Sequence, residues 1–392
     1  MGHKQTASHR FGKASYHQIG LVRGQFGNVE MNKWVKFLQD SGFDGWEEAS
    51  WELDLRKCDS DAGAEAYARE RYNLAKSHNL EIFTVATHLQ GQGLGDEPSA
   101  KTLQFCKQGE SEARAAYKAW RDKGNQPPRT DPYFVPPEVG RLIHQEATRD
   151  LIACVRLAHY LGKLQNRKVA LPGFVGSPAH CWSHFFLFPP LPDSVEGHKL
   201  PDVRDVSLGL LVERFGPVLD ACKKYGVTFD LECHPSERAM GDLESANDYL
   251  KAMDKAGYSN IVGFNLDGSH LEWQNVSVIQ FIREFAERIH CAHVKGVWVA
   301  REHCRAGRLG GHRPMGHWAN GWNFVTAGTQ RDANSLEEIF IELNRVGFDG
   351  AVSIEWEDND AEQHAGAKTA LANCRRADNP PSGMRHDEML KA

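Results

Sequence analysis

Four short apolar segments in the second half of the chain each end in a residue type that binds metal ions. They are Val227–Glu232, Ile261–Asp267, Ile289–His293 and Ala351–Glu355. A short apolar run bounded by Gly or polar residues is typical of a buried strand in a parallel sheet. Two Glu, one Asp and one His form an oxygen-rich ligand set that suits Mn²⁺, with Mg²⁺, Co²⁺ or Zn²⁺ as alternatives. The pattern predicts a metalloenzyme with one divalent cation. Its expected ligands are Glu232, Asp267, His293 and Glu355.

Each of these residues taken alone has a simpler structural explanation. Glu232 could form a buried salt bridge, and Asp267 could cap the turn that follows it. His293 could be a hydrogen-bonded core imidazole, and Glu355 could be an exposed charge where a strand meets a loop. The metal site is favoured because all four residues end successive predicted strands, with a helix between each pair.

The elements that must position these residues alternate between strand and helix along the chain. The other expected strands are Tyr16–Val22, Gly45–Glu48, Glu81–Thr87 and Val169–Phe174. The expected helices are Asn32–Ser41, Glu65–Ser77, Gln145–Leu161, Leu208–Tyr225, Leu243–Ala256, Val278–Arg288 and Leu336–Val346. Eight such units predict an α/β fold, a (β/α)₈ TIM barrel, whose chemistry lies at the C-terminal strand ends. A doubly wound open sheet is the alternative, but ligands on four successive strands converge better in a closed barrel.

Three stretches are too long for the loops of a minimal barrel. They follow the third, fourth and seventh strands and cover about residues 90–138, 176–205 and 300–331, and the first contains one helical piece near Glu110–Lys123. We therefore expect one barrel domain over residues 1–377, with these insertions around the mouth of the site. A flexible C-terminal tail is expected over residues 378–392.

The composition excludes several classes of partner. With 392 residues, 41% hydrophobic and 25% charged, the chain can bury a large core. A net charge of −6 favours a small molecule over nucleic acid or an anionic membrane, and no apolar run is long enough to cross a bilayer. Nine scattered cysteines without a CxxC pair suit a reducing compartment, and the polar N-terminus shows no secretory signal. A cytoplasmic protein is expected.

Six separate motifs in these segments resemble the xylose-isomerase-like TIM barrels, a family of sugar phosphate isomerases and epimerases. The motifs are ExHP (Glu232–Pro235), NxDxSHLxWQ (Asn265–Gln274), HxxHxK (His290–Lys295), GFDGxxSIExED (Gly347–Asp358), THLQGQ (Thr87–Gln92), and FVGSP with FPP (Phe174–Pro178 and Phe188–Pro190). The resemblance covers most of residues 16–375 apart from the insertions.

The resemblance implies roles for particular residues. It gives the four expected ligands their metal-binding role, and it implies that Glu232 and Glu355 also move protons on opposite faces of a bound sugar. The implied activity is a divalent-metal-dependent sugar isomerase or epimerase, in which a proton moves next to a metal-chelated carbonyl through an enediolate. The positions that would line the sugar pocket are His88, His234, His270 and Lys295.

The chain departs from the family pattern at two positions. The family often has Asp after the Lys of HxK, whereas Gly296 follows Lys295 here. The usual Trp-His after GSP is also altered to GSPAHCWSH, which offers His180 and His184 near Trp182.

A second hypothesis follows from the same resemblance. Some family members resemble the larger subunit of deglycosidases, lyases that release the aglycone of 3-oxo-glucosides by β-elimination. His180 or His184 would then be the general acid, and a small β-rich partner subunit would be needed beside the expected homo-oligomer. Aromatic side chains in the insertions would suit a flat aglycone, although simple loop packing also explains them. They are Trp182, Phe185, Phe186, Trp298, Trp318 and Trp322.

Two further hypotheses come from other classes. An abasic-site endonuclease of the related three-metal type would recruit further ligands such as His88 and Glu48, but the acidic balance argues against nucleic acid. A non-catalytic sugar-binding barrel would not need two carboxylates at the metal.

Overall fold

Eight parallel strands form the centre of the molecule. The structure is a computed structural model that describes residues 16–184, 192–235, 242–300, 304–305, 307–309 and 313–380, without the side chains of residues 182–184. The strand order is β3-β2-β1-β12-β9-β8-β7-β4, and all of the pairs are parallel. The two ends of this series also meet, because the backbone N–H of Val85 donates to Ala170 at 3.0 Å and that of Thr87 to Pro172 at 2.7 Å. The predicted TIM barrel is confirmed. Its strands are β1 (Ile19–Val22), β2 (Gly45–Ala49), β3 (Glu81–Ala86), β4 (Leu171–Gly173), β7 (Phe229–Glu232), β8 (Val262–Asp267), β9 (Ile289–Val294) and β12 (Val352–Ile354).

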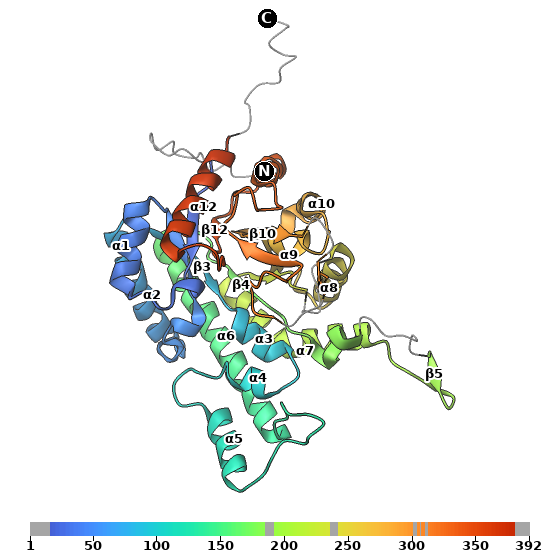
Figure 1. The fold of residues 1–392 in the computed structure, drawn as a ribbon. Coiled ribbons are helices and arrows are strands. Elements are labelled where there is room, and N and C mark those ends of the chain that lie inside the picture. The colour runs from blue at the N-terminus through green and yellow to red at the C-terminus, as the bar shows by residue number, and fades with distance from the viewer. Residues whose placement is uncertain are drawn as a thin grey trace, which may run out of the picture.

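Helices surround this barrel on its outer side (Figure 1). Helix α1 (Met31–Ser41) shows why the chain folds this way: Trp34, Val35 and Leu38 recur at helical spacing and are all buried in the core. Gly42 then ends the helix in the left-handed conformation with φ 84°, which glycine adopts without strain. The other outer helices are α2 (Asp61–Ser77), α6 (Pro137–Gln165), α7 (Val203–Tyr225), α8 (Leu243–Lys255), α10 (Val278–Glu284), α11 (Leu336–Val346) and α12 (Gln363–Ala377). None of the helices in the described ranges is long and apolar enough to cross a membrane.

Helix α6 is considerably longer than the predicted segment Gln145–Leu161. Its N-terminal turns include Pro137, whose fixed φ is compatible with a first helical position. It runs on to Asn166, which caps it in the left-handed conformation with φ 53°. The apolar periodicity marked only the part of α6 that faces the barrel. The N-terminal part packs instead against the first insertion, in a small apolar cluster that includes Val139 and Ile143.

The three insertions follow β3, β4 and β9, as predicted. The first contains α3 (His88–Gly95), α4 (Ala100–Leu103) and α5 (Glu112–Asp122), and the described part of the second contains the hairpin β5 (Ser194–Val195) and β6 (His198–Lys199). In Figure 1, α5 and β5 stand away from the barrel. The third contains the antiparallel pair β10 (Gly296–Val299) and β11 (Trp322–Val325).

A buried contact joins the first strand region to the end of α12. Asp378 accepts hydrogen bonds from the backbone N–H of His17 at 2.6 Å and pairs with its ring Nδ1 at 2.9 Å. Both residues are buried, so the expected tail is held in place at its first residue. Residues 381–392 of that tail lie outside the described ranges.

Replacing Asp378 by Ala is expected to lower the free energy of unfolding by about 1–3 kcal/mol, because the buried donors of His17 lose their acceptor. Urea unfolding followed by circular dichroism measures this change. The neighbouring Asn379→Ala is the control, since Asn379 is exposed. Equal stability of the Asp378 variant and wild type would show that this contact does not hold the chain ends.

Candidate metal centre

The four predicted ligands meet at one point of the barrel mouth. Each offers one ligand atom, and these atoms all lie within 4.8 Å of one another. Strand register contributes directly, because Asp267 of β8 lies opposite His293 of β9. Parallel strands in register bring their C-terminal ends to one layer, so side chains far apart in sequence converge there. The four residues are Glu232, Asp267, His293 and Glu355.

The two carboxylate oxygens of Asp267 have different partners. Its Oδ1 accepts from the backbone N–H and the hydroxyl of Ser269, at 2.8 and 2.7 Å, and so caps α9 (Gly268–Glu272). Its Oδ2 is buried, forms an ion pair with Lys295 at 3.0 Å and makes no hydrogen bond within the described residues. This oxygen points into the cluster as an available ligand atom.

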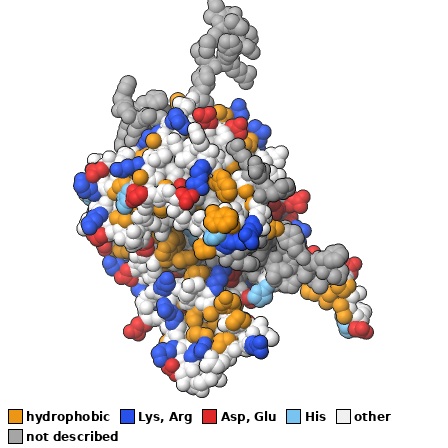
Figure 2. All heavy atoms as spheres, in the orientation of Figure 1, with side chains coloured by type: hydrophobic (Ala, Val, Ile, Leu, Met, Phe, Trp, Pro, Cys, Tyr) orange, Lys and Arg blue, Asp and Glu red, His pale blue; other side chains and the backbone are white. Residues whose placement is uncertain are grey.

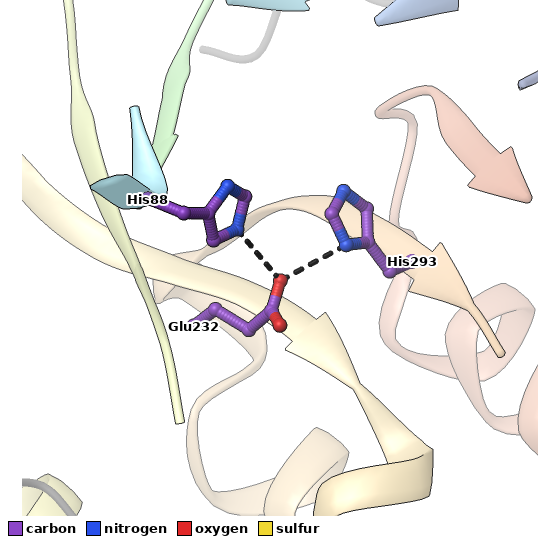
Figure 3. A group of neighbouring side chains, drawn as sticks. All are labelled: His88, Glu232 and His293. Atoms are coloured by element: carbon purple, nitrogen blue, oxygen red, sulfur yellow. Dashed lines mark hydrogen bonds and ion pairs between the residues drawn. The ribbon is translucent and has the colours of Figure 1, made fainter. Parts of the chain in front are cut away.

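Glu232 lies between imidazole rings. Figure 3 shows its carboxylate between His88 and His293, whose ring nitrogens lie 3.1 and 2.9 Å from Oε2. The side-chain amide of Asn265, the neighbour in β8, donates to the same oxygen at 2.7 Å. His270 lies 3.3 Å from the other oxygen. Glu232 is therefore surrounded by donors that hold its orientation.

Glu355 follows the end of β12 and is held in a similar way. Its Oε1 accepts from the side-chain amide of Gln25 at 2.7 Å, and its Oε2 lies 2.8 Å from the ammonium of Lys295 and 3.2 Å from His293 Nδ1. Gln25 also donates to Glu357 at 3.1 Å. The alternative of an exposed charge at a loop is wrong for Glu355, whose side chain is only 10% exposed.

The charges of this cluster control its pKa values. Burial alone would raise the pKa of Glu232, but His293 and His88 outweigh it and hold the pKa well below its usual range. Burial likewise would lower the pKa of Lys295, but Asp267 and Glu355 raise it well above its usual value. The carboxylate of Glu232 therefore stays ionised, which is the state that binds cations.

The predicted sugar-pocket residues lie around this cluster together with aromatic rings. The ring of Phe174 lies 4.6 Å from that of His88 and 4.8 Å from that of His234. On another side, the ring of Phe324 lies 5.5 Å from that of His270 and 4.5 Å from the Lys295 ammonium. Hydrogen-bonding groups and apolar rings therefore lie side by side around the cluster.

Neither proposed general acid is placed in this cluster. His180 is exposed, in a turn where its backbone adopts φ 50°, and it lies near the carboxylate of Glu97. The side chain of His184 lies outside the described part of the structure, as do those of Trp182, Phe185 and Phe186.

The described aromatic residues of the third insertion differ in their surroundings. Trp322 stacks on Trp273 with the rings 4.6 Å apart and 6° from parallel, which agrees with loop packing. Trp298 is half-buried, whereas Trp318 is 79% exposed.

Sequence reasoning selected the wrong one of two adjacent glutamates on β2. Glu48, considered as a ligand for the endonuclease hypothesis, points out of the barrel and forms two hydrogen bonds with Arg71, at 2.8 and 3.0 Å. Glu47 points inward and lies 3.1 Å from His293 Nε2. Successive side chains of a strand point to opposite faces, so only one of the two can reach the site. The alternation Gly45, Glu47 against Trp46, Glu48 was the available signal.

The residue after Lys295 also has a steric explanation. Gly296 begins β10, and a Cβ at this position would lie 2.5 Å from the carbonyl oxygen of Val325 in β11. Any side chain here, including the Asp of the family pattern, would displace β11. The third insertion therefore excludes the Asp.

The donor set fits a divalent cation. Three carboxylates and one imidazole, all buried, match the ligands that Mn²⁺, Mg²⁺, Co²⁺ or Zn²⁺ accept.

On the face drawn in Figure 2, Lys and Arg side chains are mixed with Asp and Glu side chains, without the continuous basic stripe that a nucleic-acid backbone requires.

A model of the family described as "Xylose isomerase-like TIM barrel" matches residues 35–377. The chain belongs to this family. Over 112 residues it is 34% identical to the uncharacterized protein YfiH of Bacillus subtilis (strain 168), a match that spans 28% of this chain and 36% of that protein. The chain thus aligns with about a third of this relative's length.

Solved structures with the same fold include two sugar epimerases. One is the apo form of the 3-keto-D-glucoside 4-epimerase YcjR from E. coli, with a TM-score of 0.51, 14% identity, and coverage of 92% of this chain and 99% of that chain. The other is the D-psicose 3-epimerase from Clostridium cellulolyticum H10 with D-tagatose, with a TM-score of 0.52, 15% identity, and the same coverage. At these identities the similarity establishes the fold.

Proposed function

We propose that this protein is a divalent-metal-dependent sugar isomerase or epimerase that moves a proton next to a carbonyl through an enediolate. The observation that carries the proposal is the convergence of four ligand atoms within 4.8 Å, from four successive strand ends. Membership of the xylose isomerase-like family and the fold shared with two sugar epimerases support the same class of substrate.

The residues of the cluster divide between binding and proton transfer. Glu232, Asp267, His293 and Glu355 would hold the cation, which when bound supplies positive charge that stabilises an oxyanion. The carboxylates of Glu232 and Glu355 would remove and return the proton, and each accepts a hydrogen bond from a side-chain amide, from Asn265 and Gln25 respectively. A base held in one orientation loses less entropy when the reaction begins.

Groups around the cluster would recognise the sugar. His270 and Lys295 supply buried donors for its oxygen atoms, and the rings of Phe174 and Phe324 supply apolar surfaces for its C–H faces. The exclusion of water by these rings would strengthen each hydrogen bond in the site. His88 and His234 complete the wall on the side of Phe174.

Exchange of hydrogen with solvent tests the proposal. Protein loaded with Mn²⁺ and incubated in D₂O with ketohexoses, D-psicose and D-tagatose among them, and with 3-keto-D-glucosides is expected to incorporate deuterium at the carbon next to the carbonyl. Mass spectrometry and NMR of the recovered sugar measure this incorporation, and chelator-treated protein is the control. Equal incorporation with and without the cation would contradict metal dependence.

The same incubation separates epimerisation from β-elimination. Release of an aglycone from a 3-keto-glucoside, without epimerised sugar, would make the chain a deglycosidase subunit. If His180 were the general acid of that reaction, His180→Ala would reduce aglycone release by about 10²–10⁴-fold. Since His180 is exposed and lies outside the cluster, we expect this substitution to change turnover less than 10-fold.

A further inference from the structure

Glu47 is a buried carboxylate for which the proposed reaction has no role. It lies on β2 and is fully buried. Its described partners are two: the hydroxyl of Thr84, which donates to Oε2, and the ring of His293, whose Nε2 lies 3.1 Å from both oxygens. A charged carboxylate without a compensating partner is costly to bury, so its close pairing with a single imidazole requires an explanation.

The two ring nitrogens of His293 face two different sets of carboxylates. Nδ1 lies 2.9 Å from Glu232 and 3.2 Å from Glu355, on the side of the candidate metal centre. Nε2 faces Glu47 on the opposite side of the ring. An imidazole that binds a metal ion must be neutral and then carries one N–H, which an ionised carboxylate can only accept. Glu47 therefore favours the tautomer with the proton on Nε2, and the lone pair of Nδ1 is left to the metal centre.

We propose that Glu47 is a positioning residue that fixes the tautomer and the ring orientation of His293 for metal binding through Nδ1. Glu47 is not among the four side chains whose ligand atoms lie within 4.8 Å of one another, which separates it from the ligands. The Thr84 hydroxyl holds the carboxylate against the barrel wall, so the chain of contacts runs from β3 through β2 to β9. The proposal rests on the proposed cation, but not on the sugar chemistry.

The tautomer of His293 can be observed in the wild-type protein. Zn²⁺ is suitable because it is diamagnetic, and long-range ¹H–¹⁵N spectra of protein labelled at histidine distinguish the two nitrogens. The signals of His293 are assigned with a His293→Gln variant. We expect a protonated, hydrogen-bonded Nε2 and a metal-bound Nδ1. A ring that binds Zn²⁺ through Nε2 would overturn the proposal, whatever the variants show.

Metal affinity provides the second readout. Isothermal titration with Zn²⁺ is expected to show an affinity about 10–100-fold weaker for Glu47→Ala than for wild type, as for other residues that orient a metal-binding imidazole. The matched control is Glu48→Gln, at the adjacent position on the outer face of β2, where Arg71 is the partner. This variant is expected to lose stability and keep its Zn²⁺ affinity within about 3-fold of wild type, because Glu48 has no contact with His293.

The outcomes separate this proposal from the proposed function. Unchanged Zn²⁺ affinity in a folded Glu47→Ala protein would overturn the positioning role, even if hydrogen exchange into a sugar were observed. Conversely, the expected tautomer and affinity loss would establish the role even if no sugar tested exchanged hydrogen. If Glu47→Ala and Glu48→Gln weakened Zn²⁺ affinity equally, the cause would be a general destabilisation of β2, and the positioning role would also be overturned.

Discussion

Replacing Glu355 by Gln is expected to reduce turnover by about 10²–10⁴-fold, the usual contribution of a general base, while the protein remains folded. Gln has the same shape and can still accept from Gln25, but it cannot take up a proton or bind a cation as strongly as a carboxylate. Turnover of the exchange reaction and circular dichroism of the variant measure the two parts of this result. Full activity would remove Glu355 from the mechanism.

The matched control for this substitution is Glu357→Gln. Glu357 shares two partners with Glu355, since Gln25 donates to it at 3.1 Å and Lys295 lies 3.7 Å away. It is outside the four-residue cluster, although the two substitutions remove the same charge from the same segment. We expect turnover of Glu357→Gln to fall less than 10-fold, well short of a general base's contribution. Equal losses in the two variants would mean that local charge, rather than the cluster, determines activity.

Replacing Lys295 by Met is expected to lower the free energy of unfolding of the cation-free protein by about 3–5 kcal/mol. Lys295 is buried between the carboxylates of Asp267 and Glu355, at 3.0 and 2.8 Å, and its removal leaves both without this compensating charge. Saturating Mn²⁺ supplies positive charge at the same place. A cation at 100 times its dissociation constant is expected to restore about 2.7 kcal/mol. Urea unfolding with and without Mn²⁺ measures both changes.

An exposed ion pair of similar length provides the control for Lys295. Lys101 lies 2.9 Å from Asp96, but its side chain is 50% exposed. Lys101→Met should therefore change the free energy of unfolding by about 1 kcal/mol or less, and Mn²⁺ should stabilise this variant as much as it stabilises wild type, because its metal site is intact. If Lys295→Met changed the free energy of unfolding no more than Lys101→Met does, the Lys295 charge would not stabilise the carboxylates at the barrel mouth.

The positions of the ligands could be predicted from the sequence because each ends an apolar run. Such runs form buried strands regardless of the length and composition of the loops. In a parallel barrel, the last residue of each strand then lies at the mouth. Glu232 and Asp267 therefore came together as expected. The insertions were recognisable for the opposite reason, since their polar, Gly-rich and Pro-rich composition interrupts the periodicity.

The sequence did not reveal features that depend on the direction of a side chain or on a contact between distant segments. Glu47 and Glu48 are identical in type and adjacent, and only the pleat of β2 decides that one reaches His293 while the other pairs with Arg71. The role of Gln25 depends on a segment 330 residues away. His180 has a residue type that suits catalysis, yet it is exposed, in a turn where its backbone adopts φ 50°.

A crystal structure of the protein soaked in Mn²⁺, with anomalous scattering recorded at the manganese edge, shows whether the four side chains bind one cation. We expect one anomalous peak at the barrel mouth within about 2.0–2.4 Å of oxygen atoms of Glu232, Asp267 and Glu355 and of Nδ1 of His293. The absence of a peak there at saturating Mn²⁺, or a peak held by other side chains, would contradict it.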